Sequence, residues 1–321
     1  MENFIFSLNA TIPIFILIVL GWILMKAGIL TKGFNSAADK YVFKVALPVL
    51  LFKDIATANI REDFDPKFFF FCMIATTLMF LGVWLFTSLF MKDKTMVGAF
   101  VQASARGSAA VLGIAFVNNI YGSSGMAPMM IVAAVPLYNI FSVIILSVCS
   151  NDKKANASTS EQIKRTLLNV LKNPIILGIV AGLPFSLLGI DITGPAFAIP
   201  YKAVTNIAAT ATPIALLVVG ASFEGRKAIK KIKPTMAATF IKLVLLPAIF
   251  FPFAVMLGFR NSELVAILVM LGSPTTVTCY IMAKNMGNDE VLSSSVVVTA
   301  TLLSSISLTF WVFLLRTLGL I

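Results

Sequence analysis

The sequence predicts an all-α polytopic membrane protein with ten transmembrane helices arranged as two inverted five-helix repeats. Three observations lead to this prediction: an apolar composition, ten long apolar stretches, and helix-breaking residues that recur at a constant offset. Hydrophobic residues make up 59% of the 321 residues and charged residues 12%, and the mean hydropathy is +0.96. Such a chain has too few polar side chains to cover its surface in water, so we expect a lipid bilayer around it.

Ten apolar stretches are long enough to cross a membrane, since a spanning helix needs about 20 mostly apolar residues. They are separated by short polar breaks and cover 4–29, 36–56, 68–90, 96–120, 126–149, 173–189, 201–222, 235–258, 262–285 and 291–316. Only Glu2 precedes the first stretch, with no basic region before it and no small-residue cleavage site after it. We therefore expect a retained first span and not a signal peptide.

The basic residues are distributed unevenly among the breaks. The formal net charge is +11, but the basic residues lie mostly between spans, where anionic headgroups attract them, so no nucleic-acid partner is predicted. With five basic residues inside spans set aside, fifteen of the 25 Lys and Arg lie in the breaks after spans one, three, five, seven and nine, and five lie on the opposite side. The positive-inside rule predicts a multi-pass protein of the cytoplasmic membrane with both termini outside the cytoplasm.

Metal-binding and catalytic side chains are scarce. The chain has no His, and Cys72, Cys149 and Cys279 lie singly within apolar stretches, without the spacing of a metal site. We expect these cysteines to be packing residues. The sequence predicts no metal site, no cofactor and no enzymatic activity.

Helix-breaking residues of the first half recur in the second. Three points in span one match three points in span six at an offset of 161 residues: Pro13, Gly21 and Gly28 against Pro174, Gly182 and Gly189. Pro48 matches Pro213 at an offset of 165, and Gly107 matches Pro274 at an offset of 167. We therefore predict a first repeat at 1–149, a cytoplasmic linker at 150–165 and a second repeat at 166–321. Because each repeat has an odd number of spans, the second is inverted, as in many secondary transporters.

Spans four and nine each contain a helix-breaking residue near mid-membrane, followed by residues that can start a new helix. Span four has Arg106, Gly107 and Ser108 at this depth. Span nine has Pro274, Thr275, Thr276 and Thr278. Backbone breaks at membrane depth are tolerated where they line a cavity or are buried in protein. Two restarting helices would direct their N-terminal N–H groups at one point, which favours an anion. We predict a substrate site there, formed by these seven residues.

Arg106 is the strongest single signal in this prediction. It lies about ten residues, or roughly 15 Å, from the start of its span, too deep for easy snorkelling. Intramembrane charges are usually functional, and the alternative is a structural role with a buried carboxylate or carbonyl partners. We predict that Arg106 neutralises the charge of an anionic substrate.

Other polar residues inside spans carry weaker signals. We expect Lys242 and Lys44 to snorkel to the interface, and Lys53 and Asp54 to lie at the interface or to pair with each other. Gly178 and Gly182 predict close helix packing.

Polar residues at mid-depth of spans five and ten leave two interpretations open. Tyr138 and Asn139 in span five either hold helices together or bind substrate, and we include both as candidate substrate-binding residues. For Ser304, Ser305 and Ser307 in span ten we favour contacts between helices.

These residues also carry a resemblance. The chain resembles a bacterial member of the auxin efflux carrier family, which includes the plant PIN-type carriers and bacterial malate and malonate permeases. The resemblance runs nearly end to end. Its motifs are Ala46-Leu47-Pro48 through Phe52, Arg106-Gly107-Ser108, Gly113-Ile114, Tyr121-Gly122, Leu243 with Pro247, and Pro274-Thr275 through Ala283-Lys284.

The resemblance implies two crossover helices, spans four and nine, whose breaks hold a carboxylate-bearing substrate. It implies a scaffold of spans one, two, six and seven, a moving transport domain of the other six spans, and leaves open a homodimer through the scaffold. It raises Tyr138 and Asn139 as substrate contacts. The chain departs from the family pattern at Ser108 and Thr278, where Asn is common, and at Leu51, which can be polar in the plant carriers.

Three classes of function compete. We expect a carrier of small organic anions, with substrates that are mono- or dicarboxylates, auxin-like or malate-like. A sodium-coupled symporter of the bile-acid-carrier type would need carboxylates and carbonyls at the crossovers, and neither crossover contains an acidic residue. A receptor or an enzyme is the least favoured class, because the longest soluble stretch is the linker.

Overall fold

The structure is a computed structural model that describes the chain except for residues 1, 58–63, 124, 151–167, 169–170 and 224. The predicted linker, 150–165, thus lies almost wholly outside the described residues. The described part is helical apart from its connections and one isolated bridge, between Gly107 and Thr275. The protein is an all-α polytopic membrane protein, as the composition predicted.

The helices of the first half follow the expected spans closely. They are α1 (Glu2–Lys26), α2 (Lys32–Tyr41), α3 (Leu47–Ala56), α4 (Pro66–Phe90), α5 (Val97–Ala105), α6 (Ala109–Tyr121) and α7 (Ala127–Val148). A π-helical turn, Val42–Ala46, joins α2 to α3, so that the two form one continuous span. Span four is divided into α5 and α6.

The second half is also helical. Its helices are α9 (Pro174–Leu188), α10 (Ala198–Ser222), α11 (Gly225–Lys230), α12 (Ile232–Phe240), α13 (Leu246–Met256), α14 (Asn261–Gly272), α15 (Thr278–Asn285) and α16 (Glu290–Thr317). A second π-helical turn, Ile241–Leu245, joins α12 to α13. Span nine is divided into α14 and α15.

Within the described residues, five helices are long and apolar enough to cross a membrane unaided. They cover Pro66–Phe90, Ala127–Val148, Pro195–Ser222, Ile232–Met256 and Glu290–Thr317. Spans four and nine fall short of this length because each is broken in the middle. The span formed by α2 and α3 contains six charged residues, and α9 has only 15 residues.

Side-chain caps and glycines determine where the spans begin and end. Asp65 and Asn173 accept hydrogen bonds from the first turns of α4 and α9, and each precedes a proline, whose missing N–H costs nothing at this position. Gly122 and Gly189 follow α6 and α9 with φ of 71° and 68°. Such left-handed backbone at a helix end favours glycine.

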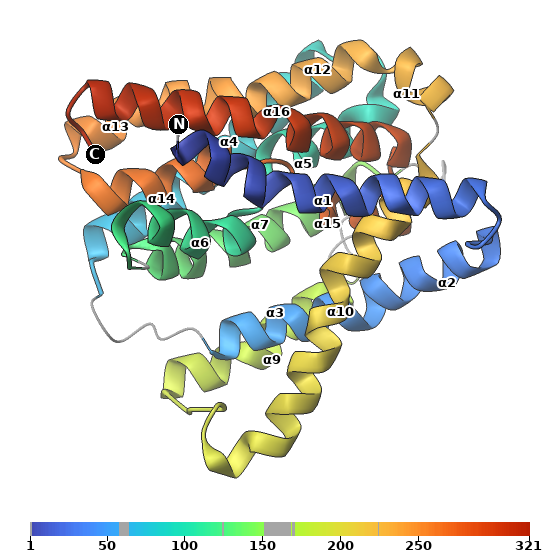
Figure 1. The fold of residues 1–321 in the computed structure, drawn as a ribbon, viewed down its shortest axis with the longest axis horizontal. Helices are drawn as coiled ribbons and strands as arrows, with labels where there is room; N and C mark the ends of the chain where they lie inside the picture. Colours follow the sequence, from blue (N-terminus) through green and yellow to red (C-terminus); the bar gives the residue numbers. More distant parts are fainter. Residues whose placement is uncertain (1, 58–63, 124, 151–167, 169–170, 224) are drawn as a thin grey trace.

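The helices form two groups (Figure 1). One group consists of α1, α2, α3, α9 and α10, in which α3 packs along α9 and α1 along α10. The other group consists of α4 to α7 and α12 to α16, and it has a hydrophobic core of its own that draws no residue from the first group. A second core joins the first group to α5, α7, α15 and α16.

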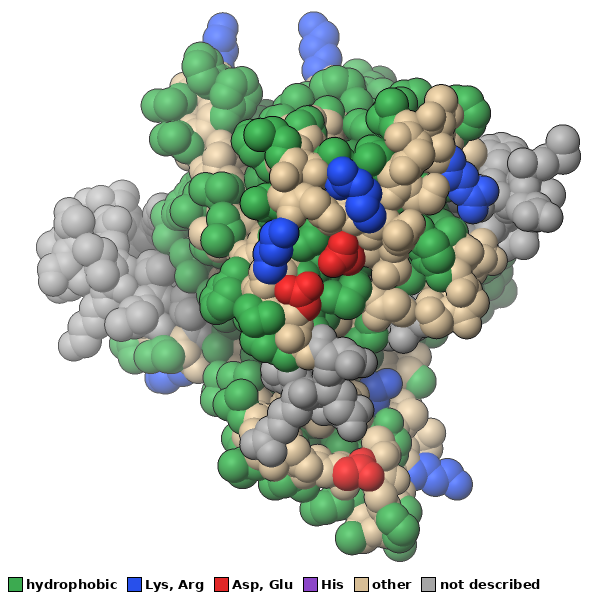
Figure 2. Space-filling view, turned by 90° about the vertical axis from the view of Figure 1, so that its left-hand side faces the viewer, with side chains coloured by type: hydrophobic (Ala, Val, Ile, Leu, Met, Phe, Trp, Pro, Cys, Tyr) green, Lys and Arg blue, Asp and Glu red, His purple; other side chains and the backbone are tan. Residues whose placement is uncertain are grey.

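Both chain ends lie toward one end of the long axis, and α11 and the connection from α1 to α2 lie at the opposite end (Figure 1). The end with the termini carries scattered charged side chains among hydrophobic ones (Figure 2).

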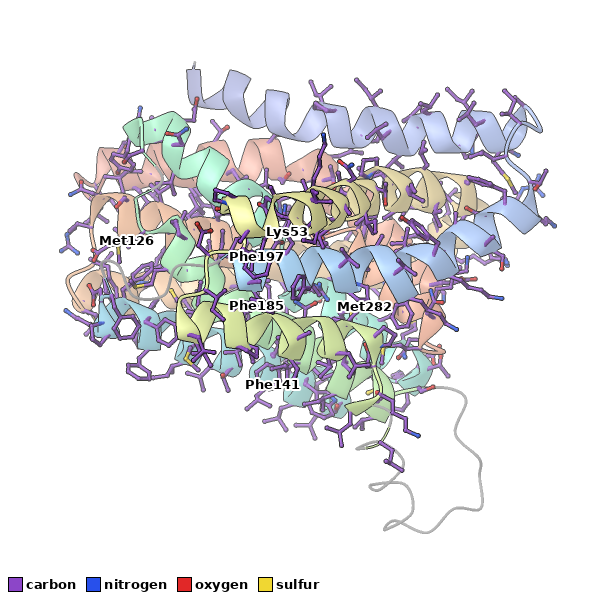
Figure 3. The ribbon with its side chains drawn as sticks, turned by 90° about the horizontal axis from the view of Figure 1, so that it is seen from below. Lys53, Met126, Phe141, Phe185, Phe197 and Met282 are labelled. Atoms are coloured by element: carbon purple, nitrogen blue, oxygen red, sulfur yellow. The ribbon has the colours of Figure 1, made fainter. Side chains whose placement is uncertain are left out.

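Glycines allow the closest helix contacts of the first group. A Cβ on Gly21 of α1 would lie 2.3 Å from the Leu217 carbonyl oxygen of α10, and a Cβ on Gly220 would lie 1.9 Å from the Ile18 carbonyl oxygen. A Cβ on Gly178 of α9 would lie 2.4 Å from the Pro48 carbonyl oxygen of α3. The prediction of close packing at Gly178 and Gly182 is confirmed. The rings of Phe52 on α3 and Phe185 on α9 also pack edge to face, with centroids 5.6 Å apart. Figure 3 labels Phe185 on α9.

We expect Gly220→Ala to lower the stability of the folded protein by about 1 to 3 kcal/mol, the usual cost of overpacking. The new methyl group would meet backbone of α1, which cannot rotate away. The measurement is the thermal unfolding temperature in detergent. Gly82→Ala in α4 is the matched control, because nothing lies within 4 Å of its Cβ position and Ala favours the helix. Equal unfolding temperatures for the two variants would contradict the close approach of α1 and α10.

Candidate functional site: the crossover of the two broken helices

The two helix breaks meet and pair with each other. The backbone leaves the helical conformation at Arg106 (φ −82°, ψ 115°) and at Ser273 (φ −67°, ψ 153°). Gly107 and Thr275 form an antiparallel bridge, in which the Ser108 N–H donates to the Pro274 carbonyl oxygen at 2.9 Å. The breaks expected from the sequence at Gly107 and Pro274 are confirmed, and the structure brings them to one point.

Gly107 occupies a position with no room for a side chain. An ideal Cβ there would lie 2.4 Å from Ser273 Oγ and 2.8 Å from Lys242 Nζ. The Thr275 hydroxyl donates to the Ala103 carbonyl oxygen at 2.7 Å and thereby ties the second break to the end of α5. The pairing therefore depends on glycine at 107.

New helices start immediately after the breaks. Helix α6 begins after Ser108 and α15 after Val277, and neither N-cap residue donates or accepts a side-chain cap hydrogen bond. In the first turn of α15 the Cys279 and Tyr280 N–H groups donate to the Thr276 and Val277 carbonyl oxygens at 3.0 and 3.1 Å, and both helix starts carry the positive end of the helix dipole. Ser108 and Thr276 are partly exposed, whereas the other predicted crossover residues are buried: Arg106, Gly107, Pro274, Thr275 and Thr278.

Arg106 is buried between α5, α7 and α15, with 6% of its surface exposed. Its Nη2 donates to Asn139 Oδ1 at 2.8 Å and its Nη1 to Met282 Sδ at 2.7 Å. Met282, labelled in Figure 3, is itself fully buried. Among the described residues, no carboxylate lies within ion-pair distance of the guanidinium. A thioether is a weak acceptor, so the cation has weaker partners than a guanidinium normally has.

Gln102 adds a second underused polar group beside Arg106. It lies one turn earlier on α5, and its Nε2 donates to the same Met282 sulfur at 3.4 Å. Within the described part of the chain, its buried Oε1 has no hydrogen-bond partner, and neither has the buried Ser273 Oγ at the other break. Gln102 and Met282 were not predicted from the sequence, because only the packing of α5 against α15 brings Met282 to Gln102 and Arg106.

Tyr138 and Asn139, the candidates on α7, are both buried behind the crossover. The Tyr138 hydroxyl donates to the Met270 carbonyl oxygen at 2.7 Å, near the end of α14. Asn139 accepts from Arg106 and donates to the Val135 carbonyl oxygen at 2.9 Å. The structure thus brings Asn139 to Arg106, and it places the Tyr138 hydroxyl at the end of a broken helix.

Lys242 corrects one expectation. We expected its side chain to snorkel to the interface, but it is fully buried. Its Nζ donates to the carbonyl oxygens of Ala105 at 3.1 Å, Met270 at 3.3 Å and Leu271 at 2.7 Å, which belong to the last turns of α5 and α14. The expectation was wrong because these orphan carbonyls attract a donor more strongly than the distant interface does.

The remaining polar candidates have local partners. Lys53 and Asp54 pair at 3.9 Å, as expected, and Lys44 is exposed. The hydroxyls of Ser304, Ser305 and Ser307 donate to carbonyl oxygens of their own helix and not to a neighbouring one, so the expectation of contacts between helices was wrong for these donors. Cys72 and Cys279 are buried free thiols, in line with packing roles.

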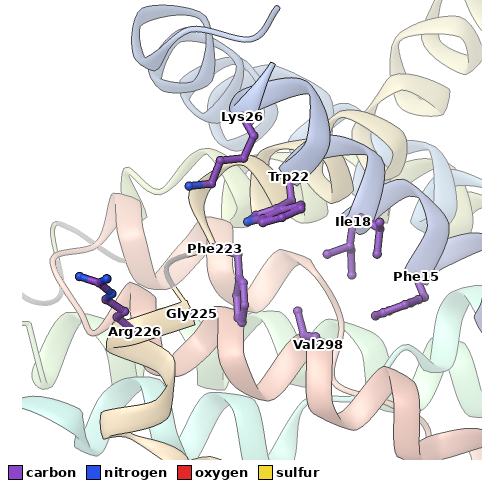
Figure 4. Close-up of a pocket in the computed structure, with 9 residues that line it drawn as sticks. Phe15, Ile18, Trp22, Lys26, Phe223, Gly225, Arg226 and Val298 are labelled. Carbon is purple, nitrogen blue, oxygen red and sulfur yellow. The ribbon is translucent and has the colours of Figure 1, made fainter. Parts of the chain in front are cut away.

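A separate pocket lies away from the crossover, between α1, the end of α10, the start of α11 and α16 (Figure 4). Lys26 and Arg226 lie at its edge. The aromatic and aliphatic side chains that line it are Phe15, Ile18, Val19, Trp22, Phe223 and Val298. None of the predicted site residues lines this pocket. It opens between α1 of the first helix group and α16 of the second.

Comparison with known proteins places this crossover in a family. A family model described as membrane transport protein matches residues 6–312, nearly the whole chain. The chain belongs to the auxin efflux carrier family. The resemblance seen in the sequence is thereby confirmed.

Similar family members occur in archaea and bacteria. The chain is 22% identical to an uncharacterized transporter of Methanothermobacter thermautotrophicus over 309 residues, 96% of this chain and 98% of the relative. It is 24% identical over 323 residues to the uncharacterized transporter YfdV of Escherichia coli O157:H7 and to that of Shigella flexneri, each match covering 97% of this chain and 98% of the relative. As a member of this auxin efflux carrier family the protein is a membrane transporter.

Proposed function

We propose that this family member is a secondary transporter of small organic anions, which it binds at the crossover and carries by alternating access. The substrates we propose are mono- or dicarboxylates, either auxin-like or malate- and malonate-like. The observation that carries the proposal is Arg106, a buried cation without an ion-pair partner in the described chain, at the point where two helix N-termini begin. A bound carboxylate would supply the missing negative charge.

The proposed site has an accessible part and a buried part. Ser108 and Thr276 form the accessible part, where their hydroxyls can donate to a carboxylate beside the positive ends of the α6 and α15 dipoles. Thr278, whose hydroxyl contacts that of Thr276 at 3.4 Å, extends it. Arg106 lies behind it and raises the local positive potential, and Asn139 holds its guanidinium. Gly107, Pro274 and Thr275 hold the two breaks together, and Tyr138 supports the end of α14.

Ten spans in two inverted repeats are the architecture we propose for this transport. Two glycine contacts support the repeat. Gly21 faces the Leu217 carbonyl, and a Cβ on Gly182 would lie 2.8 Å from the Phe52 carbonyl. Gly21 and Gly182 are equivalent at the offset of 161, and Phe52 and Leu217 are equivalent at the offset of 165. The same contact thus occurs twice, with the halves exchanged, as a twofold relation between inverted repeats requires.

The two helix groups support a scaffold and a moving transport domain. The scaffold would contain α1, α2, α3, α9 and α10, which also offers the surface for a homodimer. One ion pair joins the groups: Lys284 of α15 contacts Asp39 of α2 at 2.8 Å. Asn285 adds a hydrogen bond of 3.3 Å to the same carboxylate. In an elevator-type movement of the transport domain this contact would have to break.

The proposal fixes a topology in the cytoplasmic membrane with both termini outside. We expect single cysteines at Lys230 and Ser158, on a background without the three native cysteines, to be shielded from an impermeant thiol reagent added to intact cells. Ser158 lies outside the described residues but within the predicted cytoplasmic linker. A cysteine at Ala196, between α9 and α10, is the control and should be labelled. Labelling at Lys230 with protection at Ala196 would contradict the orientation.

A thermal-shift screen of the purified protein against carboxylates tests the proposed substrate class. A ligand that binds the folded state raises the unfolding temperature in a concentration-dependent way. We expect saturable stabilisation by at least one of malate, malonate and indole-3-acetate. Stabilisation by cationic or neutral solutes, with none by any carboxylate, would contradict the proposal.

A sodium-coupled symporter is the alternative. It would need oxygen ligands for sodium at the crossover. The described structure has carbonyl oxygens of this kind at the ends of α5 and α14, but a lysine is bound to them.

A further inference from the structure

The C-terminal ends of α5 and α14 form a second charged site, on the opposite side of the breaks from the N-termini of α6 and α15. The carbonyl groups in the last turn of a helix have no partner within it and carry the negative end of the dipole. Here two such ends converge, and the oxygens of Ala105, Met270 and Leu271 point at one atom, Lys242 Nζ. Three converging carbonyl oxygens at two helix C-termini are the ligand set of a monovalent cation.

Lys242 fits this site as a cation. An ammonium group has three N–H donors and no acceptor, and it makes three carbonyl hydrogen bonds here. The side chain is fully buried, and no carboxylate of the described chain lies within ion-pair distance of it. Its charge is therefore compensated by the two helix ends, as the charge of a bound metal ion would be.

The sequence permits this placement because Lys242 lies in the π-helical turn Ile241–Leu245 of the α12–α13 span. Such turns are frequent at functional sites. The ammonium also lies against the crossover itself, since a Cβ on Gly107 would be 2.8 Å from Nζ and 2.9 Å from Cε. Lys242 thus contacts both broken helices at the point where they pair.

We propose that Lys242 is a built-in cation that occupies a cation site at the crossover, so that the protein assembles and binds its substrate without a sodium or other alkali ion. Lys242 is a positioning residue in this account: it acts by holding the ends of α5 and α14 together. The proposal rests on the proposed function only for the role of the crossover in transport, because occupancy of the cation site can be measured without any organic anion.

Truncation of the lysine should expose the cation site. The experiment measures the unfolding temperature of purified wild-type protein, Lys242→Ala and Lys242→Met in choline chloride, with NaCl, KCl or LiCl replacing it at constant ionic strength. In Lys242→Ala the three carbonyls lose the ammonium, with Met270 still accepting from the Tyr138 hydroxyl, and a small cation can take the place of the ammonium. We expect a saturable rise of at least about 3 °C in one of these alkali salts at about 100 mM, as for a ligand well above its dissociation constant.

The other proteins make this result specific. Wild-type protein should show no difference between the salts, because its site is filled. Lys242→Met should be destabilised and insensitive to the salts, because the side chain fills the space without a charge. Lys44→Ala, which removes an exposed lysine from the other π-helical turn, is the matched control and should behave as wild type.

Two results would overturn the proposal. One is a Lys242→Ala protein that folds but responds to no alkali cation. The other is wild-type protein that is stabilised saturably by sodium over choline, which does not depend on whether any variant folds. Absence of carboxylate binding in the separate screen would contradict the proposed function and leave the cation result unchanged.

Discussion

Arg106→Gln is expected to weaken binding of a carboxylate ligand roughly 5- to 150-fold, or about 1 to 3 kcal/mol, the range of a charge-assisted hydrogen bond. The substitution removes the buried cation but leaves an amide that can still donate to Asn139 Oδ1, the present partner of Arg106. The measurement is the dissociation constant for the carboxylate that stabilises wild-type protein most, determined by calorimetry, with thermal unfolding as the check of folding.

Two further variants show whether the positive charge of Arg106 or its forked geometry causes this loss of affinity. Arg106→Lys keeps the charge and should bind more tightly than Arg106→Gln if the positive potential matters most, and equally weakly if a forked contact to the carboxylate is made. Arg316→Gln, the same change at an exposed arginine near the end of α16, is the matched control and should bind as wild type. Unchanged affinity in Arg106→Gln would make Arg106 a structural residue.

Gly107→Ala is expected to reduce transport at least tenfold. Its methyl group would lie 2.4 Å from Ser273 Oγ and 2.8 Å from Lys242 Nζ. Either the paired backbone of the two breaks or the Lys242 side chain must therefore move. A displacement of this kind costs about 1 to 3 kcal/mol. The measurement is the initial rate of radiolabelled malonate or malate uptake into proteoliposomes, whichever the wild-type protein transports.

A double variant tests whether this contact causes the loss. Ser273→Ala removes the oxygen that the new methyl group meets first, so Gly107→Ala with Ser273→Ala should recover part of the rate.

Pro274→Leu should also lower transport, because it allows a straighter helix through the second break. Wild-type rates in both Gly107→Ala and Pro274→Leu would refute the role of the crossover.

The positions of the breaks could be predicted from sequence because they depend on local chemistry. Gly107 and Pro274 interrupt apolar stretches at matching depths. Non-helical backbone at that depth is tolerated only where it is buried in protein or lines a cavity. The G-x-x-x-G spacing of Gly178 and Gly182 likewise predicted the close helix contacts there. What the sequence did not contain was which atoms the breaks would face.

Lys242 and Arg106 illustrate what was missing. Lys242 lies about seven residues from the end of its span, a distance at which a long side chain can reach either the interface or the protein interior. The Lys242 side chain lies in the interior because the ends of α5 and α14, which are distant in sequence, converge there and accept its hydrogen bonds. Arg106 was identified by its depth, but its contact with Met282 depends on how α5 and α15 pack across the crossover.

Uptake of labelled carboxylates by the purified protein in liposomes tests the central claim most directly. With malonate, malate and indole-3-acetate as probes, the account predicts saturable uptake of at least one, above protein-free liposomes, inhibited by unlabelled carboxylates and lost in Gly107→Ala. The account would be contradicted if no carboxylate accumulated above that background while the same preparation transported a cationic or neutral solute.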